Sequence, residues 1–268
     1  MRKIEVEELK RLQIEILKAV HACCMKNDIA YWLDSGTLLG AIRHNGYIPW
    51  DDDIDLGMLR PAYEKFRKVF NQENNRYRFV CAEDHKDYCY AYGKVLDTNT
   101  VLYEPDRQGR KLAVNIDIIV YDNAPEDDRE VARMYRIRDF YRGCNVARSQ
   151  KNDVIPGLKR KIAFQVLHVL LRPFPRNYFA RKMSENAQKC KNQDTKRIGN
   201  FTCYAVFVCE KTVFDSFIEH EFEGKQYRIP SGYDQWLKVL YGEYMQLPPE
   251  EKRVSTHSFE AYWLKDRG

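Results

Sequence analysis

Asp51-Asp52-Asp53-Ile54-Asp55 places four carboxylates in five consecutive positions, and this stretch decides the fold that we expect. Carboxylates crowded in this way repel one another, so a chain keeps them where a cation or water neutralises them. On an extended strand, alternation of the side chains puts Asp51, Asp53 and Asp55 on one face. Carboxylates at this spacing suit a hard divalent cation such as Mg²⁺ or Mn²⁺. A solvated or capping cluster is the alternative that these residues alone leave open.

Two other acidic motifs share these letters but fit the chain less well. An EF-hand loop that begins at Asp51 needs glycine and glutamate where the chain has Leu56 and Ala62. The DDxxD motif of prenyl-diphosphate enzymes lies on a long helix, whereas Pro49 and Gly57 flank the cluster here. Calcium-loop binding and prenyl-diphosphate chemistry are therefore disfavoured.

The residues before the cluster predict a short strand, a turn and a helix. Residues 31–37 have the composition of a strand followed by a turn, and Leu38–Arg43 that of a helix, with Ser35 or Thr37 as the N-cap. A helix N-terminus favours phosphate, because its N–H groups are free and carry positive partial charge. Gly36 would let the backbone approach such a ligand closely. An ordinary strand–turn–helix is the alternative interpretation.

A further aspartate lies inside an apolar run. The segment Val114–Val120 has the composition of a buried strand, with Asp117 in its middle. A carboxylate in such a place is costly unless it is paired, hydrogen-bonded or bound to a metal. A core arginine or a backbone amide would satisfy it. The sharper interpretation is a third metal ligand, on a strand beside Asp53 and Asp55.

Together these elements follow the order of the polymerase-β-type nucleotidyltransferase fold. The segments Trp32–His44 and Gly46–Asp55 resemble the LicD family, bacterial phosphocholine transferases that are related to fukutin and fukutin-related protein. Further blocks that resemble the family are Tyr92–Thr100, Phe222–Pro230 and Tyr241–Pro249. The resemblance covers residues 30–120 and 217–257 and leaves residues 125–200 unmatched.

The resemblance implies an α+β fold with a mixed sheet flanked by helices, while the unmatched residues 125–200 are expected to form a basic helical insertion because of their charge. It implies that Asp53, Asp55 and Asp117 are catalytic residues that hold Mg²⁺, or alternatively Mn²⁺. Asp117 would also accept the proton of the attacking hydroxyl. The residues implied to contact the donor are Ser35, Gly36, Thr37, Arg43, Asp51 and Lys94.

The implied reaction moves phosphocholine, or another alcohol phosphate, from CDP-choline or a related CDP-alcohol to a sugar hydroxyl, and releases CMP. The acceptor would be a teichoic-acid or lipopolysaccharide precursor. Two other enzyme classes stay open. A GT-A glycosyltransferase uses Asp-x-Asp but needs neither the Ser-Gly-Thr turn nor Asp117, and a nucleotidylyltransferase uses a nucleoside triphosphate. A binding protein without catalysis would have lost one of the three aspartates.

Length and cysteine content are consistent with a cytoplasmic enzyme. The 268 residues, 44% of them hydrophobic, fit one large domain with an insertion. We expect a catalytic core with an N-terminal helix over residues 1–124, a basic helical insertion over 125–200, and a C-terminal part over 201–268 that packs back on the core. Apolar residues at helical spacing predict a helix within Met1–Val20, which lacks the apolar core of a signal peptide. The eight cysteines form no CxxC motif, so we interpret them as reduced thiols.

The net charge of +5 is distributed very unevenly. The segment from Arg129 to Arg197 contains 18 Lys and Arg residues and 5 Asp and Glu residues, which gives it a net charge of +13. The rest of the chain contains 26 Lys and Arg and 34 Asp and Glu, which gives a net charge of −8. The apolar run Ile162–Leu171 lies between Lys159-Arg160-Lys161 and Arg172 and is too short to span a bilayer. It fits a basic amphipathic helix at the inner face of the cell membrane, or one against an anionic, lipid-linked glycan acceptor. A core-packing helix is the alternative, and no nucleic-acid partner is expected.

The C-terminal part carries recognisable turn and cap signals. Glu221–Lys225 predicts a hairpin turn. Ser231 and Asp234 predict a capping box before the helical run Trp236–Leu240, and Gly242 predicts its C-cap.

Overall fold

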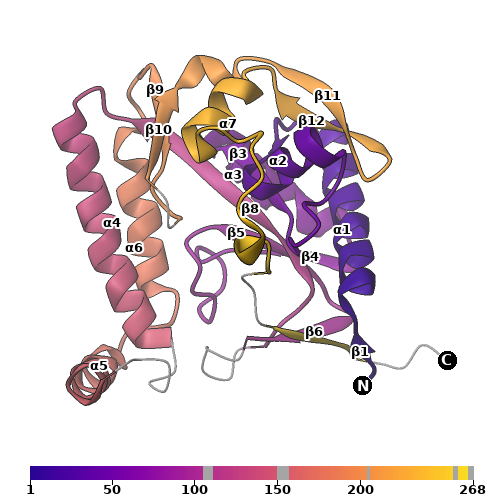
Figure 1. Cartoon of the computed structure of the whole chain (residues 1–268). Coiled ribbons are helices and arrows are strands. Elements are labelled where there is room, and N and C mark those ends of the chain that lie inside the picture. Colours follow the sequence, from indigo (N-terminus) through magenta and orange to yellow (C-terminus); the bar gives the residue numbers. More distant parts are fainter. Residues whose placement is uncertain (105–110, 150–156, 204–205, 256–258, 265–268) are drawn as a thin grey trace.

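The computed structural model describes residues 1–268 except 105–110, 150–156, 204–205, 256–258 and 265–268 (Figure 1). In chain order the elements are β1 (Lys3–Ile4), α1 (Val6–Lys26), β2 (Trp32–Leu33), α2 (Ser35–His44), β3 (Asp55–Leu59), α3 (Arg60–Glu73), β4 (Tyr77–Val80), β5 (Gly93–Asp97), β6 (Thr100–Tyr103), β7 (Lys111–Leu112), β8 (Asn115–Ala124), α4 (Asp128–Ser149), α5 (Leu158–Leu171), α6 (Tyr178–Ala187), η2 (Gln188–Cys190), β9 (Arg197–Asn200), β10 (Phe207–Glu210), η3 (Lys211–Phe214), β11 (Phe217–Phe222), β12 (Lys225–Pro230), α7 (Tyr233–Tyr241), η4 (Glu250–Lys252) and β13 (Glu260–Trp263).

A mixed sheet forms the centre of the molecule, and the long strand β8 organises it. The strand order is β10-β9-β8-β3-β2, and β5 also pairs with β8 while β4 pairs with β5. Only the β3–β8 pair is parallel among these described pairings. β5 pairs with the first part of β8 and β9 with its last three residues. The expected α+β fold with a mixed sheet is thus confirmed, whereas its nucleotidyltransferase type stays a prediction.

A smaller sheet joins the two ends of the chain. Its order is β1-β13-β6-β7, so the first and last described strands lie side by side (Figure 1). A separate hairpin, β11–β12, turns at Glu223 and Gly224, which both have positive φ (51° and 72°). Such a two-residue turn matches the right-handed twist of the strands, so the predicted hairpin is confirmed.

The N-terminal helix packs by the predicted apolar spacing. Leu9, Leu12, Ile16 and Val20 on α1 are all buried. The helix starts only at Val6 and runs to Lys26, and the residues before it form β1. All eight cysteines lie in the described part of the chain and are free thiols.

Most of the basic segment 125–200 is helical. α4 and α6 pack along each other, and α5 crosses the far end of α4 at the edge of the molecule (Figure 1). The segment returns to the main sheet because β9 pairs with residues Asp122–Ala124 of β8. None of the described helices is long and apolar enough to cross a membrane.

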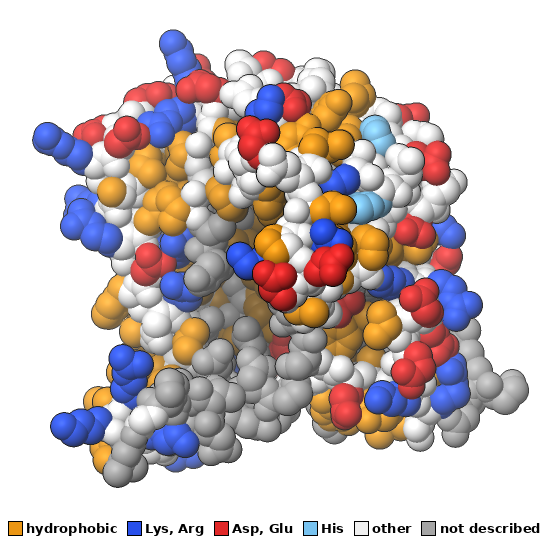
Figure 2. All heavy atoms as spheres, viewed as in Figure 1, with side chains coloured by type: hydrophobic (Ala, Val, Ile, Leu, Met, Phe, Trp, Pro, Cys, Tyr) orange, Lys and Arg blue, Asp and Glu red, His pale blue; other side chains and the backbone are white. Residues whose placement is uncertain are grey.

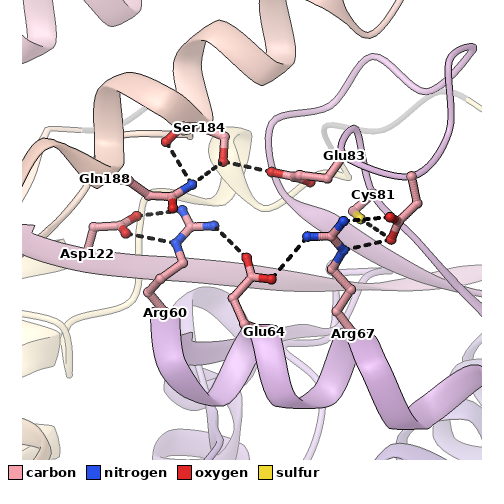
Figure 3. Close-up of polar contacts among 9 residues, drawn as sticks. Arg60, Glu64, Arg67, Cys81, Glu83, Asp122, Ser184 and Gln188 are labelled. Carbon is pink, nitrogen blue, oxygen red and sulfur yellow. Dashed lines mark hydrogen bonds and ion pairs between the residues drawn. The ribbon is translucent and has the colours of Figure 1, made fainter. Parts of the chain in front are cut away.

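Ion pairs and hydrogen bonds tie the helices to the sheet (Figure 3). Arg60, at the start of α3, donates two hydrogen bonds of 2.8 and 2.7 Å to Asp122 of β8, and both side chains are almost fully buried. Ser184 of α6 donates to Glu83 at 2.7 Å, which connects the helical segment to the loop before β5. These contacts link α3 to the central strand β8, and α6 to the loop before β5.

The predicted capping box of the last helix is wrong. The N-cap of α7 is Gly232, and no side chain caps this end. The Ser231 hydroxyl instead shares a 2.7 Å hydrogen bond with Ser216, while Asp234 accepts from Lys238. At the other end the prediction is confirmed, since Gly242 is the C-cap with φ of 64°.

Candidate active site

The parallel strands β3 and β8 bring two of the predicted aspartates together. Asp55 is the register partner of Asp117. The backbone N–H of Asp117 donates to the carbonyl of Ile54 at 2.8 Å, which fixes this register. Register partners on neighbouring strands present their side chains on the same face. Two carboxylates from distant parts of the chain are therefore adjacent.

The strand predicted over residues 51–55 is shorter in the structure than expected. β3 begins only at Asp55, and residues 51–54 precede it as irregular backbone. The burial pattern nevertheless alternates as expected: Asp52 and Ile54 are buried, whereas Asp51, Asp53 and Asp55 are partly exposed. The stretch lacks a ladder because β8 itself starts at Asn115, close to the level at which β3 begins.

Side chains from far away in the sequence hold this irregular stretch. Gln13 of α1 donates to the carbonyls of Asp52 (2.9 Å) and Asn115 (3.3 Å), which are on the two aspartate-bearing segments. Tyr47 donates its hydroxyl hydrogen to the amide oxygen of Gln13 at 3.0 Å. The Asp52 carboxylate accepts from Ser255 at 2.7 Å. Asp52 therefore has a structural role, which the sequence pattern alone did not reveal.

The site concentrates negative charge around Asp55. Burial, followed by the neighbouring carboxylates of Asp53 and Asp117, raises the pKa of Asp55 well above its usual range. Like charges in a poorly solvated place disfavour the ionised form. A cation would lower that cost, which is the electrostatic situation expected of a metal-binding carboxylate.

Lys94 lies on the other side of Asp117. It is the antiparallel register partner of Asp117 on β5, only 7% exposed, and its ammonium forms an ion pair with the Asp117 carboxylate. The same ammonium donates to Asn115 Oδ1 at 3.0 Å and lies 4.9 Å from the centre of the Tyr90 ring. Asn115 was not predicted as a site residue. The alternation of β8 would have placed it on the face of Asp117.

The Ser-Gly-Thr turn is the first turn of α2, not a turn before it. The helix starts at Ser35, whose φ is 49°, and its N-cap is Asp34, so the predicted caps are wrong. A Cβ on Gly36 would lie 2.7 Å from Asp51 Oδ2, so the glycine lets that carboxylate lie close to the start of the helix. The Thr37 hydroxyl accepts a 2.9 Å hydrogen bond from the backbone N–H of Asp55. The turn and the Asp-rich stretch thus pack directly on each other.

Asp34 is a buried acceptor that the sequence analysis missed. Its carboxylate accepts hydrogen bonds from the Tyr121 hydroxyl (2.5 Å) and from Nε1 of Trp236 (2.8 Å). Burial raises the pKa of Asp34, and the two donors partly offset this effect. Because these partners occupy its oxygens, Asp34 does not cap α2 with its side chain. It instead connects α2 to β8 and to the C-terminal helix α7.

Arg43, predicted to contact the donor, makes structural contacts. Its guanidinium donates to the carbonyls of Tyr244 (2.9 Å) and Gln246 (3.4 Å). Its Nε also donates to the ring of His44 at 3.0 Å. Arg43 thus fastens α2 to the segment that follows α7, and a role in donor binding stays a prediction.

A cavity of about 220 Å³ opens beside Asp117, the register partner of Asp55. Its polar lining includes Asp53, Asp117 and Lys94, and its aromatic lining includes Tyr90 and Tyr92. The remaining lining residues are Gln13, Asp52, Leu102, Glu104, Leu112, Asn115 and Phe259. The cavity lies between the main sheet and the smaller sheet, since residues of β5, β6, β7 and β8 line it.

The donor chemistry of these residues fits a hard divalent cation, because carboxylate oxygens are its preferred ligands. Within the described part of the chain, however, no three Asp, Glu, His or Cys side chains are already gathered around one point. Asp117 is engaged by Lys94. Binding of a cation would therefore require the side chains to rearrange.

Comparison with known proteins assigns the chain to a family. Residues 28–123 match the LicD/FKTN/FKRP nucleotidyltransferase domain. The lipopolysaccharide cholinephosphotransferase LicD of Haemophilus influenzae is 32% identical over 272 aligned residues, which cover 98% of this chain and all of that protein. An uncharacterized protein of Rickettsia typhi is 35% identical over 92 residues, covering 31% of this chain and 30% of its own. The human ribitol 5-phosphate transferase FKRP is 60% identical over 30 residues, 11% of this chain and 6% of its own. The chain therefore belongs to the LicD family.

Proposed function

We propose that this chain is a metal-dependent transferase that moves phosphocholine from CDP-choline to a sugar hydroxyl of a cell-surface glycan precursor, with release of CMP. A lipopolysaccharide or teichoic-acid precursor at the cytoplasmic face of the membrane is the proposed acceptor. The observation that carries the proposal is the pairing of Asp55 with Asp117 beside the cavity. The near full-length similarity to a protein named as a lipopolysaccharide cholinephosphotransferase supports the choice of reaction.

Asp53, Asp55 and Asp117 are the residues that would hold Mg²⁺, or Mn²⁺ in its place. When bound, the cation neutralises the diphosphate of the donor and the charge on the leaving phosphate. The raised pKa of Asp55 supports this assignment, because a nearby cation would offset the burial and the repulsion by Asp53 and Asp117 that raise it. We expect Asp117 to give up its ion pair with Lys94 when the site is loaded.

The remaining steps belong to the side chains of the protein itself. Lys94, once released, binds a phosphate oxygen of the donor, and the amides of Gly36 and Thr37 at the start of α2 bind another. The packing of Gly36 against Asp51 and of Thr37 against Asp55 supports this arrangement, because it holds the start of α2 next to the aspartates. Asp117 accepts the proton of the attacking sugar hydroxyl.

The aromatic wall of the cavity supports choline as the transferred alcohol. The rings of Tyr90 and Tyr92 already lie near one cation, the ammonium of Lys94, at 4.9 and 5.5 Å from their centres. Glu104 lines the same wall and accepts a 2.7 Å hydrogen bond from the Tyr90 hydroxyl. Aromatic faces combined with a carboxylate recognise quaternary ammonium groups. Ribitol and glycerol carry no charge and would gain nothing from this wall.

A basic groove between α4 and α6 supports an anionic acceptor. It encloses about 680 Å³, and Arg133, Arg136, Lys182 and Lys189 line it together with one acidic residue, Glu185. Tyr141 also lines the groove, and its ring packs against the cluster that contains Tyr90. The groove and the cavity are thus separated by one shared aromatic cluster.

Donor binding and turnover test the proposal together. Thermal shifts of the wild-type protein would be measured with CDP-choline, CDP-ribitol, CDP-glycerol, a UDP-sugar and CTP, each with Mg²⁺, with Mn²⁺ and with EDTA. CMP release would then be followed with lipopolysaccharide and with teichoic-acid precursors. We expect CDP-choline to give the largest metal-dependent shift and to be turned over. Stabilisation by the UDP-sugar alone would instead indicate a glycosyltransferase, and pyrophosphate release from CTP a nucleotidylyltransferase.

Two substitutions test individual residues. Lys94→Gln should reduce kcat/KM for the donor by about 30- to 1,000-fold, as for one preorganised electrostatic contact; the exposed Lys86→Gln is the matched control. Tyr90→Leu should raise KM for CDP-choline roughly 2- to 30-fold, and leave CDP-glycerol unaffected, since one cation–π contact is lost. An equal rise in KM for CDP-choline and CDP-glycerol would contradict the assignment of the aromatic wall as the choline-binding surface.

A further inference from the structure

Helix α5 is hardly packed against the rest of the molecule. The apolar run of α5 belongs, by its composition, to the interior of a protein, yet His168 is its one buried side chain among those described. His168 shares a 2.9 Å hydrogen bond with the carbonyl of Ala147 on α4. Burial of a single position does not account for ten consecutive residues with so little polarity. The alternative that the apolar run packs in the protein core is therefore wrong for the single chain.

The side of α5 that faces solvent is continuous and apolar. Ile162, Val166, Val169 and Leu170 are spaced as i, i+4, i+7 and i+8, which places them on one face of a helix. Their exposed fractions are 56%, 55%, 51% and 65%. Leu167 extends the same face and is 38% exposed. Solitary exposed apolar residues need no explanation, but a full helical face of them marks an interaction surface.

Positive charge stands at both ends of this face. From Val154 to Tyr178 the sequence contains Lys159, Arg160, Lys161, Arg172 and Arg176 and no acidic residue. At the C-terminal end, burial and the nearby charges of Arg176 and Arg172 lower the pKa of Arg148, so basic groups gather there. Figure 2 shows hydrophobic and basic side chains next to each other at the corner where Figure 1 draws α5.

The N-terminal end of α5 is unfavourable in water. Lys159, Arg160 and Lys161 occupy the first turn, and no acidic residue is present there. Cations at this end oppose the helix dipole, whereas anions stabilise it. The arrangement becomes favourable when negative charges of a partner face this turn. The partner should accordingly be both anionic and apolar, which describes a bilayer of anionic lipids better than a second, equally basic copy of this chain.

We infer that α5 docks the protein on an anionic lipid surface, with Ile162, Val166, Val169 and Leu170 below the head groups and the basic residues at both ends on lipid phosphates. A helix of 14 residues is too short to span a bilayer, so it lies in the plane of the interface. This inference does not depend on the reaction that the aspartate site performs.

Vesicle co-sedimentation tests the inference directly. The full-length protein would be mixed with vesicles of phosphatidylcholine alone or with 30% phosphatidylglycerol, at about 50 and about 500 mM NaCl. We expect binding to the anionic vesicles at low salt, and at least roughly tenfold weaker binding without phosphatidylglycerol or at high salt. Wild-type protein that does not bind anionic vesicles at low salt would overturn the inference.

Two sets of variants assign the binding to α5. Val166→Gln/Leu170→Gln and Lys159→Gln/Arg160→Gln/Lys161→Gln should each weaken binding by roughly tenfold or more, because apolar insertion and charge attraction act together. Lys159, Arg160, Val166 and Leu170 are exposed and Lys161 is partly exposed, so an unchanged thermal unfolding midpoint would show that the fold is intact. The apolar control is Val239→Gln on α7, where the side chain is 40% exposed. The charge control is the exposed set Lys68→Gln/Lys225→Gln/Lys252→Gln.

Losses of the same size in the control variants would contradict a specific role of α5. Light scattering after size-exclusion chromatography tests whether a second copy of the chain covers this face instead of lipid. A wild-type dimer that becomes a monomer in Val166→Gln/Leu170→Gln would mean that a second copy covers this face, and would also overturn the inference.

Discussion

Replacing Asp55 by asparagine should stabilise the metal-free protein while it removes metal binding and activity. Neighbouring strands lie about 4.8 Å apart, and two unit charges at that distance repel by about 3 kcal/mol at an effective dielectric constant of about 20. Lys94 partly neutralises Asp117, so we expect a gain of about 1–3 kcal/mol from the variant. For a chain of this size, that corresponds to a rise of about 2–10 °C in the unfolding midpoint.

The gain should depend on pH in a defined direction. The pKa of Asp55 is higher in the folded protein than the usual 3.8, so the folded state binds this proton more tightly than the unfolded chain does. The contribution of Asp55 to stability is therefore full below pH 3.8 and is lost as pH rises through the folded-state pKa. Asparagine does not titrate. The advantage of Asp55→Asn should grow with pH from about 4 upward and level off above the folded-state pKa.

Differential scanning calorimetry between pH 4 and pH 9, with EDTA or with Mg²⁺, measures both effects. A cation at a hundredfold excess over its dissociation constant should stabilise the wild-type protein by about 2.7 kcal/mol and the variant by much less. Asp87→Asn, at an exposed position, removes the same charge and serves as the control. The reasoning fails if Asp55→Asn melts below the wild-type protein in EDTA at neutral pH, or if Mg²⁺ stabilises both proteins equally.

Three further substitutions test the contacts around the site. Asp122→Asn should cost about 1.5–3 kcal/mol in urea unfolding, because it removes the nearer partner charge of the buried Arg60 guanidinium and leaves the longer pair with Glu64 at 3.7 Å. Trp236→Phe removes a donor from the buried carboxylate of Asp34 and should cost about 1–3 kcal/mol, measured by guanidinium unfolding. Thr37→Val leaves the backbone N–H of Asp55 without its acceptor and should weaken the Mg²⁺-induced thermal shift, while global stability falls by about 1–3 kcal/mol.

The parts of the site that local pattern determines were predictable from the sequence. The alternating burial of residues 51–55 was predictable, and an apolar run with one aspartate predicted the buried strand of Asp117. The hairpin turn at Glu223 and Gly224 was also predictable, because few residue types suit positive φ. The resemblance to the LicD family is confirmed by the comparison with relatives.

The parts that depend on long-range contacts were not predictable. Asp34 looked like a turn residue or a cap, and only the folded chain brings Tyr121 and Trp236 to its carboxylate. Gly36 was expected to make room for a ligand, and in the folded chain the carboxylate of Asp51 lies in this space. Residues 51–54 looked like part of a strand. A strand needs a hydrogen-bonded partner, however, and the pattern of these residues does not show where the partner strand β8 begins.

The contacts around Asp55 also explain why a repulsive site can persist in a stable protein. Crowded carboxylates favour separation of β3 from β8, and Lys94 relieves only the Asp117 side. Gln13 opposes this separation because it binds the backbone of both aspartate-bearing segments, and Thr37 opposes it because it binds the first residue of β3. These bonds engage backbone atoms, so they hold the strands together without neutralising the carboxylates. The negative charge thereby stays in place, as the proposed cation site requires.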